Sequence, residues 1–203
     1  MRYSPEHNNE TRQRILEAAS RLFRERGIAA VGLAKIMAEA GLTVGTFYTH
    51  FKSKEALLRE TLHRVLQSRH AELEQALRRG DLELAIRAYL SPEHRDAPGI
   101  GCPTAALASE LARHPRATRQ TFASHTEPSL EVLAEGLSKR QGKRVGRADA
   151  AAFLGLLVGT LQVARATPDH AASDAILGAG VRAALRLACR DDDRPSPQKA
   201  RGR

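Results

Sequence analysis

The chain has 203 residues, of which 42% are hydrophobic and 4% aromatic, and it carries a formal net charge of +9. This length can bury a good core in one domain or two small ones, and the richness in Ala and Leu favours an all-α fold. The positive charge has two explanations that charge alone does not separate: an arginine-rich coding bias spread over the surface, or an anionic partner such as nucleic acid.

The residue patterns of the sequence argue against several classes of protein. Cys102 and Cys189 lie far apart and outside any metal-ligand spacing, so we expect neither a disulfide framework nor a zinc site. The polar N-terminus has no secretory signal and the most apolar stretch, 148–166, is interrupted by glycines, so we expect a cytoplasmic protein without a membrane span. No phosphate-binding loop, dinucleotide fingerprint or nucleophile elbow occurs, so we expect no enzyme, no cofactor and no metal.

Three helices are predicted in the N-terminal part of the chain. The first is capped by Thr11 or Asn9, after a polar segment, and ends at Gly27. The second covers 32–40, and the third runs from 44 to about 50 after a tight turn at 41–43. A helix of two turns is unstable alone, because nucleation costs more than its few hydrogen bonds return. Its neighbours must hold it, as they hold the second helix of a helix-turn-helix, which lies in the major groove of DNA.

The third helix separates apolar from small polar side chains. Leu42, Phe47 and Phe51 are its apolar anchors, and we expect them to pack on the first two helices. The expected partners of these anchors are Leu22, Phe23 and Ile36. Small side chains let a helix approach base edges, and hydroxyl groups can bond to bases or phosphates. The predicted outward residues are Thr43, Val44, Gly45, Thr46, Tyr48 and Thr49.

Two segments of this region, ILEAASRLFRERG and AEAGLTVGTFYTHFKSKEALL, carry a specific pattern. They resemble the tetracycline-repressor (TetR) family of bacterial transcriptional regulators, over about a quarter of the chain. The resemblance implies an all-α protein with a three-helix helix-turn-helix DNA-binding domain over 1–52. It also implies a helical ligand-binding and dimerisation domain over 53–190. The charged, Pro-containing segment 191–203 is expected to be a disordered tail.

The resemblance also assigns DNA contacts to individual residues. The residues it implies are Thr43, Val44, Gly45, Thr46, Tyr48, His50 and Lys54, with Lys54 on a phosphate and His50 near the DNA backbone. Position 44 is Val where a basic or polar side chain is common, so base readout there rests on methyl contacts or is weaker. Gly32 and Leu33 stand where many members have Thr or Ser, so the family's phosphate-binding N-cap of the second helix does not carry over.

The remainder of the chain is predicted to be helical. The expected helices span 53–79, 81–90, 104–113, 116–139, 147–166 and 173–190. Segment 91–103 is rich in Pro and Gly and is expected to be the main loop. Pro128 is expected to break the helix that contains it, because proline has no N–H to donate and its ring clashes with the preceding turn.

The last two predicted helices combine apolar side chains with very small ones, among them Gly155, Gly159, Gly178 and Gly180. From the residues alone, a monomer core and a four-helix dimer interface explain this composition equally well. The resemblance favours a homodimer through Arg147–Ala166 and Ser173–Arg190, because the family dimerises through its terminal helices. A two-fold dimer also reads two half-sites of a palindrome, which compensates for the small readout of one short helix.

A ligand pocket is expected between helices of the C-terminal domain, where the resemblance implies an apolar inducer site. Each candidate is also explained by ordinary core packing; the candidates are His63, Leu66, Tyr89, Cys102, Leu107, Phe122, His125, Phe153 and Leu157. Cys102 has two interpretations. It precedes a helix N-terminus, which favours a reactive thiolate that senses oxidants or electrophiles, or it is a small buried hydrophobe.

We therefore predict a homodimeric DNA-binding transcriptional regulator, a repressor bound to a palindromic operator in double-stranded DNA. An unknown small-molecule inducer, or an oxidant or electrophile at Cys102, releases it by moving the helix over 53–79. The alternative is a helical small-molecule-binding or enzymatic protein whose basic charge is incidental. Salt-dependent and sequence-selective DNA binding separates the two.

Overall fold

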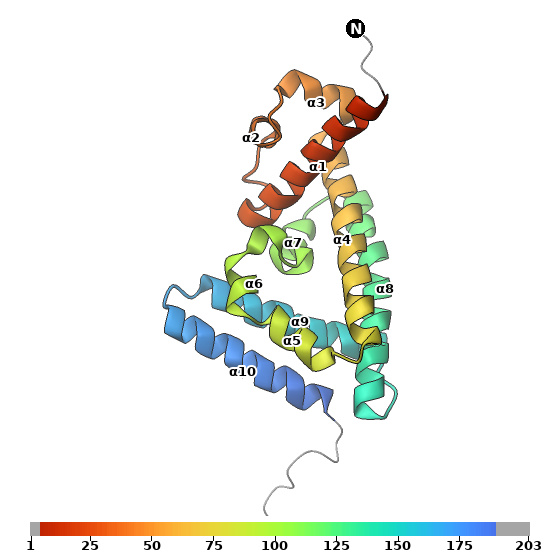
Figure 1. Cartoon of the computed structure of the whole chain (residues 1–203), viewed down its shortest axis with the longest axis vertical. Helices are drawn as coiled ribbons and strands as arrows, with labels where there is room; N and C mark the ends of the chain where they lie inside the picture. Colours follow the sequence, from red (N-terminus) through yellow and green to blue (C-terminus); the bar gives the residue numbers. More distant parts are fainter. Residues whose placement is uncertain (1–4, 190–203) are drawn as a thin grey trace, which may run out of the picture. The chain divides into compact units, whose positions relative to one another are not determined.

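The structure is a computed structural model that describes residues 5–189, and all the regular elements in that range are helical (Figure 1). The all-α class predicted from the sequence is confirmed. The described residues form two compact units: 5–74 with 92–129, and 75–91 with 130–189. Helices α4 (Lys54–Arg78) and α8 (Arg116–Gln141) each contribute to both units.

These units divide the chain at other places than the predicted boundary between 52 and 53. The units follow packing, whereas the predicted domains 1–52 and 53–190 follow roles, so those domains stay a prediction. The predicted tail, 191–203, lies outside the described residues.

The first unit begins with helix α1 (Pro5–Arg26), which starts before both predicted caps, Thr11 and Asn9. Proline suits the first turn of a helix, because its missing N–H would have no partner there and its φ is already helical. Gly27 ends the helix as predicted, with a φ of +84° that favours glycine.

Helices α2 (Leu33–Glu39) and α3 (Val44–His50) match their predicted positions. The turn between them is closed by the Leu42 N–H, which donates to the Met37 carbonyl at 2.8 Å. Phe47 and Phe51 are buried with their rings stacked 5.7 Å apart. They belong to one hydrophobic cluster with Leu22, Phe23 and Ile36, and Leu42 packs against it, so the predicted anchoring is confirmed.

Helix α4 begins as the sequence indicated, with the Ser53 Oγ accepting a hydrogen bond from the Ala56 N–H at 3.1 Å. The prediction that 91–103 is entirely a loop is wrong. Helix α6 (Pro92–Asp96) and the 3₁₀ turn η1 (Pro98–Ile100) occupy most of it, because Pro92 and Pro98 each occupy the first position of a short helix. Helix α7 (Pro103–Leu111) follows.

The predicted break at Pro128 is also wrong, since α8 continues through it to Gln141. Both Pro128 and Ser124, four residues earlier, are solvent-exposed, so the carbonyl that proline leaves without a partner can bond to water. One missing hydrogen bond therefore does not end a helix that is held on both sides.

The second unit contains helices α5 (Leu82–Tyr89), α9 (Arg147–Ala166) and α10 (His170–Ala188), with the adjoining ends of α4 and α8. Helices α9 and α10 lie side by side (Figure 1). Helix α10 starts before the predicted Ser173, because the Asp169 carboxylate caps it by accepting from the Ala172 N–H at 2.7 Å. Its predicted end, Arg190, lies outside the described residues.

Candidate nucleic-acid interface

The outer face of α3 is exposed while its inner face is held by the core. Tyr48 is 66% exposed and Val44 is 42% exposed, whereas Phe47 between them is fully buried. Gly45 and Thr49 are also exposed. Residues 44, 45, 48 and 49 share one face of a helix by their spacing. The structure therefore brings the predicted outward residues together on a single surface.

Hydroxyl groups on this surface bond to one another and to the backbone. The Thr43 and Thr46 hydroxyl oxygens are 3.2 Å apart, and the Thr49 hydroxyl donates to the Thr46 carbonyl at 2.7 Å. Thr43 is the N-cap of α3, but its side chain makes no capping hydrogen bond. The Thr43 side chain therefore accepts no hydrogen bond from the first N–H groups of α3. N–H groups at the start of a helix can bind an anion.

His50 and Lys54, at the end of this surface, are partly turned inward. Burial, and then the charge of Arg12, lower the pKa of His50 below 6.5. The Lys54 ammonium donates to the Ile28 carbonyl at 2.6 Å and lies 6.0 Å from the centre of the Phe23 ring. Lys54 therefore fastens the start of α4 to the segment after α1, whatever further contact it makes.

Two carboxylates, from α7 and α4, connect the head, which comprises α1 to α3, to the helices around it. Glu110 of α7 accepts hydrogen bonds from the N–H groups of Ile28 and Ala29 at 3.0 and 2.9 Å. Glu55, in the first turn of α4, accepts from the fully buried Thr118 hydroxyl and lies 3.2 Å from the His114 Nδ1. We call Glu55, Glu110, His114 and Thr118 the polar seam, which joins α7 and α8 to the helix-turn-helix within one compact unit.

The residues predicted to line an inducer pocket are divided between the two units. His63 of α4 and His125 of α8 are in contact, with Nδ1 and Nε2 2.7 Å apart. Phe122 packs against the cluster that contains Leu66 and Leu107. Cys102 is the half-buried N-cap of α7, and its N–H donates to the His94 Nε2 at 3.0 Å.

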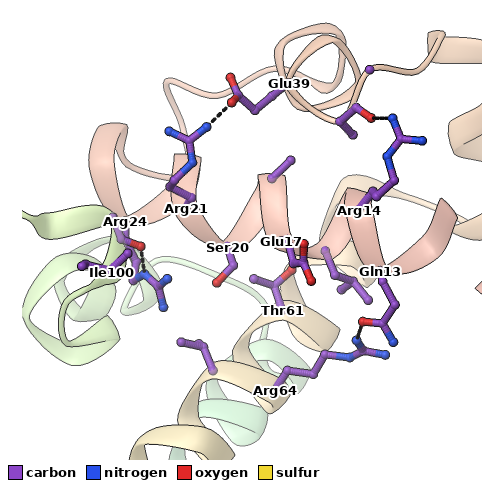
Figure 2. A pocket seen from close by; sticks show the side chains of 16 residues that line it. Gln13, Arg14, Glu17, Ser20, Arg21, Arg24, Glu39, Thr61, Arg64 and Ile100 are labelled. Atoms are coloured by element: carbon purple, nitrogen blue, oxygen red, sulfur yellow. Dashed lines mark hydrogen bonds and ion pairs between the residues drawn. The ribbon is translucent and has the colours of Figure 1, made fainter. Parts of the chain in front are cut away.

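Tyr89, Phe153 and Leu157 lie in the second unit, where Phe153 and Leu157 are buried. None of the nine candidates lines the cleft of about 730 Å³ that the first unit contains (Figure 2). This cleft follows the polar face of α1 and is bounded by the α2–α3 turn, α4 and η1. The predicted inducer pocket therefore stays a prediction.

Comparison with known proteins identifies the head. The family model for bacterial regulatory proteins of the tetR family matches residues 15–61. The chain is 50% identical over 50 residues to the HTH-type transcriptional regulator YerO of Bacillus subtilis, a match that covers 25% of this chain and 17% of YerO. It is 40% identical over 73 residues to the regulator AcrR of Shigella flexneri, which covers 36% of this chain and 34% of AcrR.

A solved structure extends the likeness beyond the head. A TetR-family transcriptional regulator from Agrobacterium tumefaciens superposes with a TM-score of 0.72 at 26% identity, over 88% of this chain and 97% of that one. The family match and this structure together indicate a TetR-family transcriptional regulator. The sequence matches to the curated relatives cover about a sixth to a third of their length, so the TetR-family signal in sequence is concentrated in the head.

The sequence did not single out Glu110 and Thr118, which hold the helix-turn-helix against α7 and α8. Glu110 meets residues 81 and 82 positions away in sequence, and Thr118 meets a residue 63 positions away. No local pattern marks such residues. Gly27 correctly indicated where α1 ends, but it did not indicate that Glu110 accepts hydrogen bonds from the next two N–H groups.

No group of three or more His, Cys, Asp or Glu side chains within residues 5–189 is arranged to hold a metal ion. By length and composition alone, α9 is long and apolar enough to cross a membrane. Its most apolar window is 28% buried within the described residues. An apolar helix with that much open surface is also what a helix at a protein interface looks like.

Proposed function

We propose that this protein is a homodimeric transcriptional repressor that binds a palindromic operator in double-stranded DNA through α3. One observation carries the proposal: Val44 and Tyr48 are exposed on a two-turn helix whose opposite face, at Phe47 and Phe51, is buried in the core. Such a helix presents its polar face rigidly to a partner. The family match over 15–61 supports DNA as that partner, and a cytoplasmic location follows from this role.

The faces of α9 and α10 support dimerisation. A Cβ added at Gly155 or Gly159 would meet no atom of residues 5–189 within 4 Å, so no contact in that range requires glycine at these positions. Val163, on the same helix, is 55% exposed, and Ala152 and Ala179 are exposed as well. Small residues that serve no internal contact are explained if a second copy of the helix pair packs closely against them.

The inducer would act by shifting a population of conformations. A dimer bound to DNA must place its recognition helices about 34–36 Å apart, which is one helical turn of DNA. A ligand that prefers another separation weakens binding by its differential affinity for the two states. The polar seam ties α7 and α8 to α3's neighbours, so a movement of these helices or of α4 can reach the head.

Cys102 offers a second trigger for release. The thiol is half-buried at the start of α7 and lies within electrostatic range of the Arg24 guanidinium. Addition of the thiolate to the double bond of a quinone would alkylate the sulfur and crowd this corner of the first unit. The Cys102→Ser variant should then keep its operator through quinone treatment that releases the original protein; equal release of both would remove Cys102 from the mechanism.

The test of DNA binding uses the palindrome upstream of the protein's own gene and a scrambled duplex, titrated at several salt concentrations. The affinity for the palindrome should exceed that for the scrambled duplex and fall steeply with salt, because Lys and Arg displace counterions from phosphates. Tyr48→Ala should weaken palindrome binding roughly tenfold or more, because an exposed aromatic contact is removed. Leu84→Ala is the matched control, since Leu84 is 64% exposed on α5, outside the head.

Equal affinity for the two duplexes would contradict operator recognition and favour the rival, a small-molecule-binding or enzymatic helical protein. Undiminished binding by Tyr48→Ala would contradict the orientation of α3 instead. A Tyr48→Phe variant then separates the phenolic hydroxyl from the ring, because it keeps the 5.2 Å edge contact with Phe47.

A further inference from the structure

The cleft beside α1 contains a compact site between three elements of the first unit. Leu16, Ser20 and Arg24 follow one another at intervals of four on α1, and Thr61 and Val65 do the same on α4. Residues four apart lie on the same helix face, so these two columns face each other. Gly99 and Ile100 of η1 close one end. Figure 2 shows Ser20 and Thr61 between the two helices, with Arg24 toward the end where Ile100 lies.

Two polar atoms of this site are buried without a hydrogen-bond partner. Thr61 is 3% exposed, and its Oγ1 has no hydrogen-bond partner. A threonine hydroxyl in a helix can usually bond to a carbonyl of the preceding turn. The Nη1 of Arg24 is also buried and unpartnered, while its Nε donates to the Gly99 carbonyl at 2.7 Å. Buried polar groups are nearly always bonded, so two such groups in one cleft indicate a missing acceptor.

The charges around the cleft favour an anion as that acceptor. Four arginines line it against two glutamates: Arg14, Arg21, Arg24 and Arg64, with Glu17 and Glu39. Arg21 already pairs with Glu39, and Arg64 donates to Gln13. Burial, and then the charge of Arg69, lower the pKa of Arg24 to about 10, against weaker opposite effects of Cys102 and Glu25. A negative charge next to the Arg24 guanidinium would favour its protonated form and so oppose the effects of burial and of Arg69 on its pKa.

The walls next to Arg24 and Thr61 are apolar. Leu16, Val65 and Ile100 supply them, and Ile100 is 67% exposed. A cationic hydrogen-bond donor and a hydroxyl beside these apolar side chains match a ligand with an anionic head and an apolar body. An inorganic anion would use only the polar half of this site.

We propose that the cleft between α1, α4 and η1 binds a small organic carboxylate, whose carboxylate group bonds to Arg24 and Thr61 and whose apolar body packs on Leu16, Val65 and Ile100. The site is separate from the inducer pocket predicted in the C-terminal domain, since none of that pocket's candidate residues lines it. Because the ligand would join α4 and η1 to α1, on which α2 packs, occupancy should alter the helix-turn-helix. Only this effect on DNA rests on the proposed function; binding of the carboxylate does not.

The experiment measures binding by calorimetry and by ¹⁵N chemical shifts on the full chain without DNA. The probes are benzoate, octanoate, acetate and benzyl alcohol, which vary the charge and the apolar body separately. Benzoate or octanoate should bind and shift the amide resonances of residues 16–24, 61–65 and 99–100. Acetate and benzyl alcohol should each bind roughly tenfold or more weakly, because each lacks one half of the ligand.

Variants place the probe in the cleft rather than elsewhere in the protein. Arg24→Gln should weaken binding of the carboxylate roughly tenfold or more, and Arg26→Gln, an exposed arginine two residues along the same helix, is the charge-matched control. Thr61→Val keeps the shape of the side chain and should also weaken binding. Arg24→Gln also removes the hydrogen bond to the Gly99 carbonyl and can disturb η1, whereas Thr61→Val leaves that bond in place.

Each result decides the proposal. Binding that Arg24→Gln and Thr61→Val both reduce, with Arg26→Gln unchanged, supports it. Binding unaffected by Arg24→Gln and Thr61→Val places the probe in another site and overturns it, as does the absence of binding by both benzoate and octanoate. If the carboxylate binds as predicted but leaves operator affinity unchanged, the site stands and only its effect on DNA is lost.

Discussion

At the scale of single residues, Thr61 and Thr118 form a natural comparison. Both are almost completely buried, but the Thr118 hydroxyl donates to Glu55 whereas the Thr61 hydroxyl has no partner. Thr61→Val should therefore raise the free energy of unfolding by about 1 kcal/mol, because it removes an unsatisfied polar atom and keeps the shape. Thr118→Val should lower it by about 1–3 kcal/mol, because it leaves the Glu55 carboxylate with one donor fewer.

Urea unfolding followed by circular dichroism measures both effects in the absence of carboxylates. A loss of stability in Thr61→Val would show that its hydroxyl is satisfied in solution. That result would also weaken the case for a ligand at this position. A gain together with weaker binding of benzoate would show that this threonine is unfavourable for folding and useful for recognition.

Gly27 illustrates two separate demands on one residue. Its φ of +84° favours glycine, and a Cβ would lie 2.5 Å from the Glu110 Oε1. Gly80 has a φ of +78° but open space around a Cβ. We expect Gly80→Ala to lower the free energy of unfolding by about 1 kcal/mol through the backbone alone. Gly27→Ala should lower it by more, because the displaced carboxylate loses the N–H groups of Ile28 and Ala29. Equal losses in urea unfolding of the two variants would show that Glu110 moves aside freely.

At the scale of elements, local signals predicted the head well. The turn, the bounds of α3 and its anchors follow from Gly41, Phe47 and Phe51, whose roles depend on neighbours close in sequence. Predictions of helix ends and loops from proline positions were less accurate. Pro128 fails to break α8 because it is exposed, and exposure is a property of the folded chain that the sequence does not display. Pro92 and Pro98 start short helices where composition suggested a loop.

The proposed dimer gives a prediction for α9. Val163→Glu places a charge on an exposed, apolar position, so the monomer should fold while the α9–α10 interface loses its apolar contact. Light scattering after size-exclusion chromatography should show a shift from dimer to monomer, with unchanged helicity. Leu84→Glu, at a somewhat more exposed apolar position on α5, should remain dimeric. A dimer in both variants would place the interface elsewhere.

At the scale of the whole molecule, the sequence predicted the DNA-reading surface better than the ligand site. The surface is one short helix, so the spacing of its residues determines which of them point outward. The polar seam and the α1 cleft join residues that lie about 40 to 80 positions apart, such as Ser20 with Thr61 and Ile28 with Glu110. Helical periodicity indicates which face of a helix is polar, but it does not indicate which other helix that face meets.

The lowered pKa values of two histidines predict that the free energy of unfolding depends on pH. Burial, and then the charges of His63 and His70, lower the pKa of His125 below 6.5, and burial and Arg12 lower that of His50. The unfolded chain therefore binds more protons than the folded one between the lowered pKa values and 6.5. In this window the free energy of unfolding rises with pH. Acidification from pH 7.5 to about 5.5 should destabilise the protein, and the loss should level off below the lowered pKa values.

Urea unfolding at constant ionic strength over this range measures the slope. His125→Gln should reduce it, because the variant lacks the imidazole whose pKa is lowered in the folded chain. His170→Gln is the comparison variant, since His170 is exposed in the first turn of α10. If His125→Gln has the same slope as the original chain, the pH dependence arises elsewhere. In that case His63 and His125 contribute only a packing contact between α4 and α8.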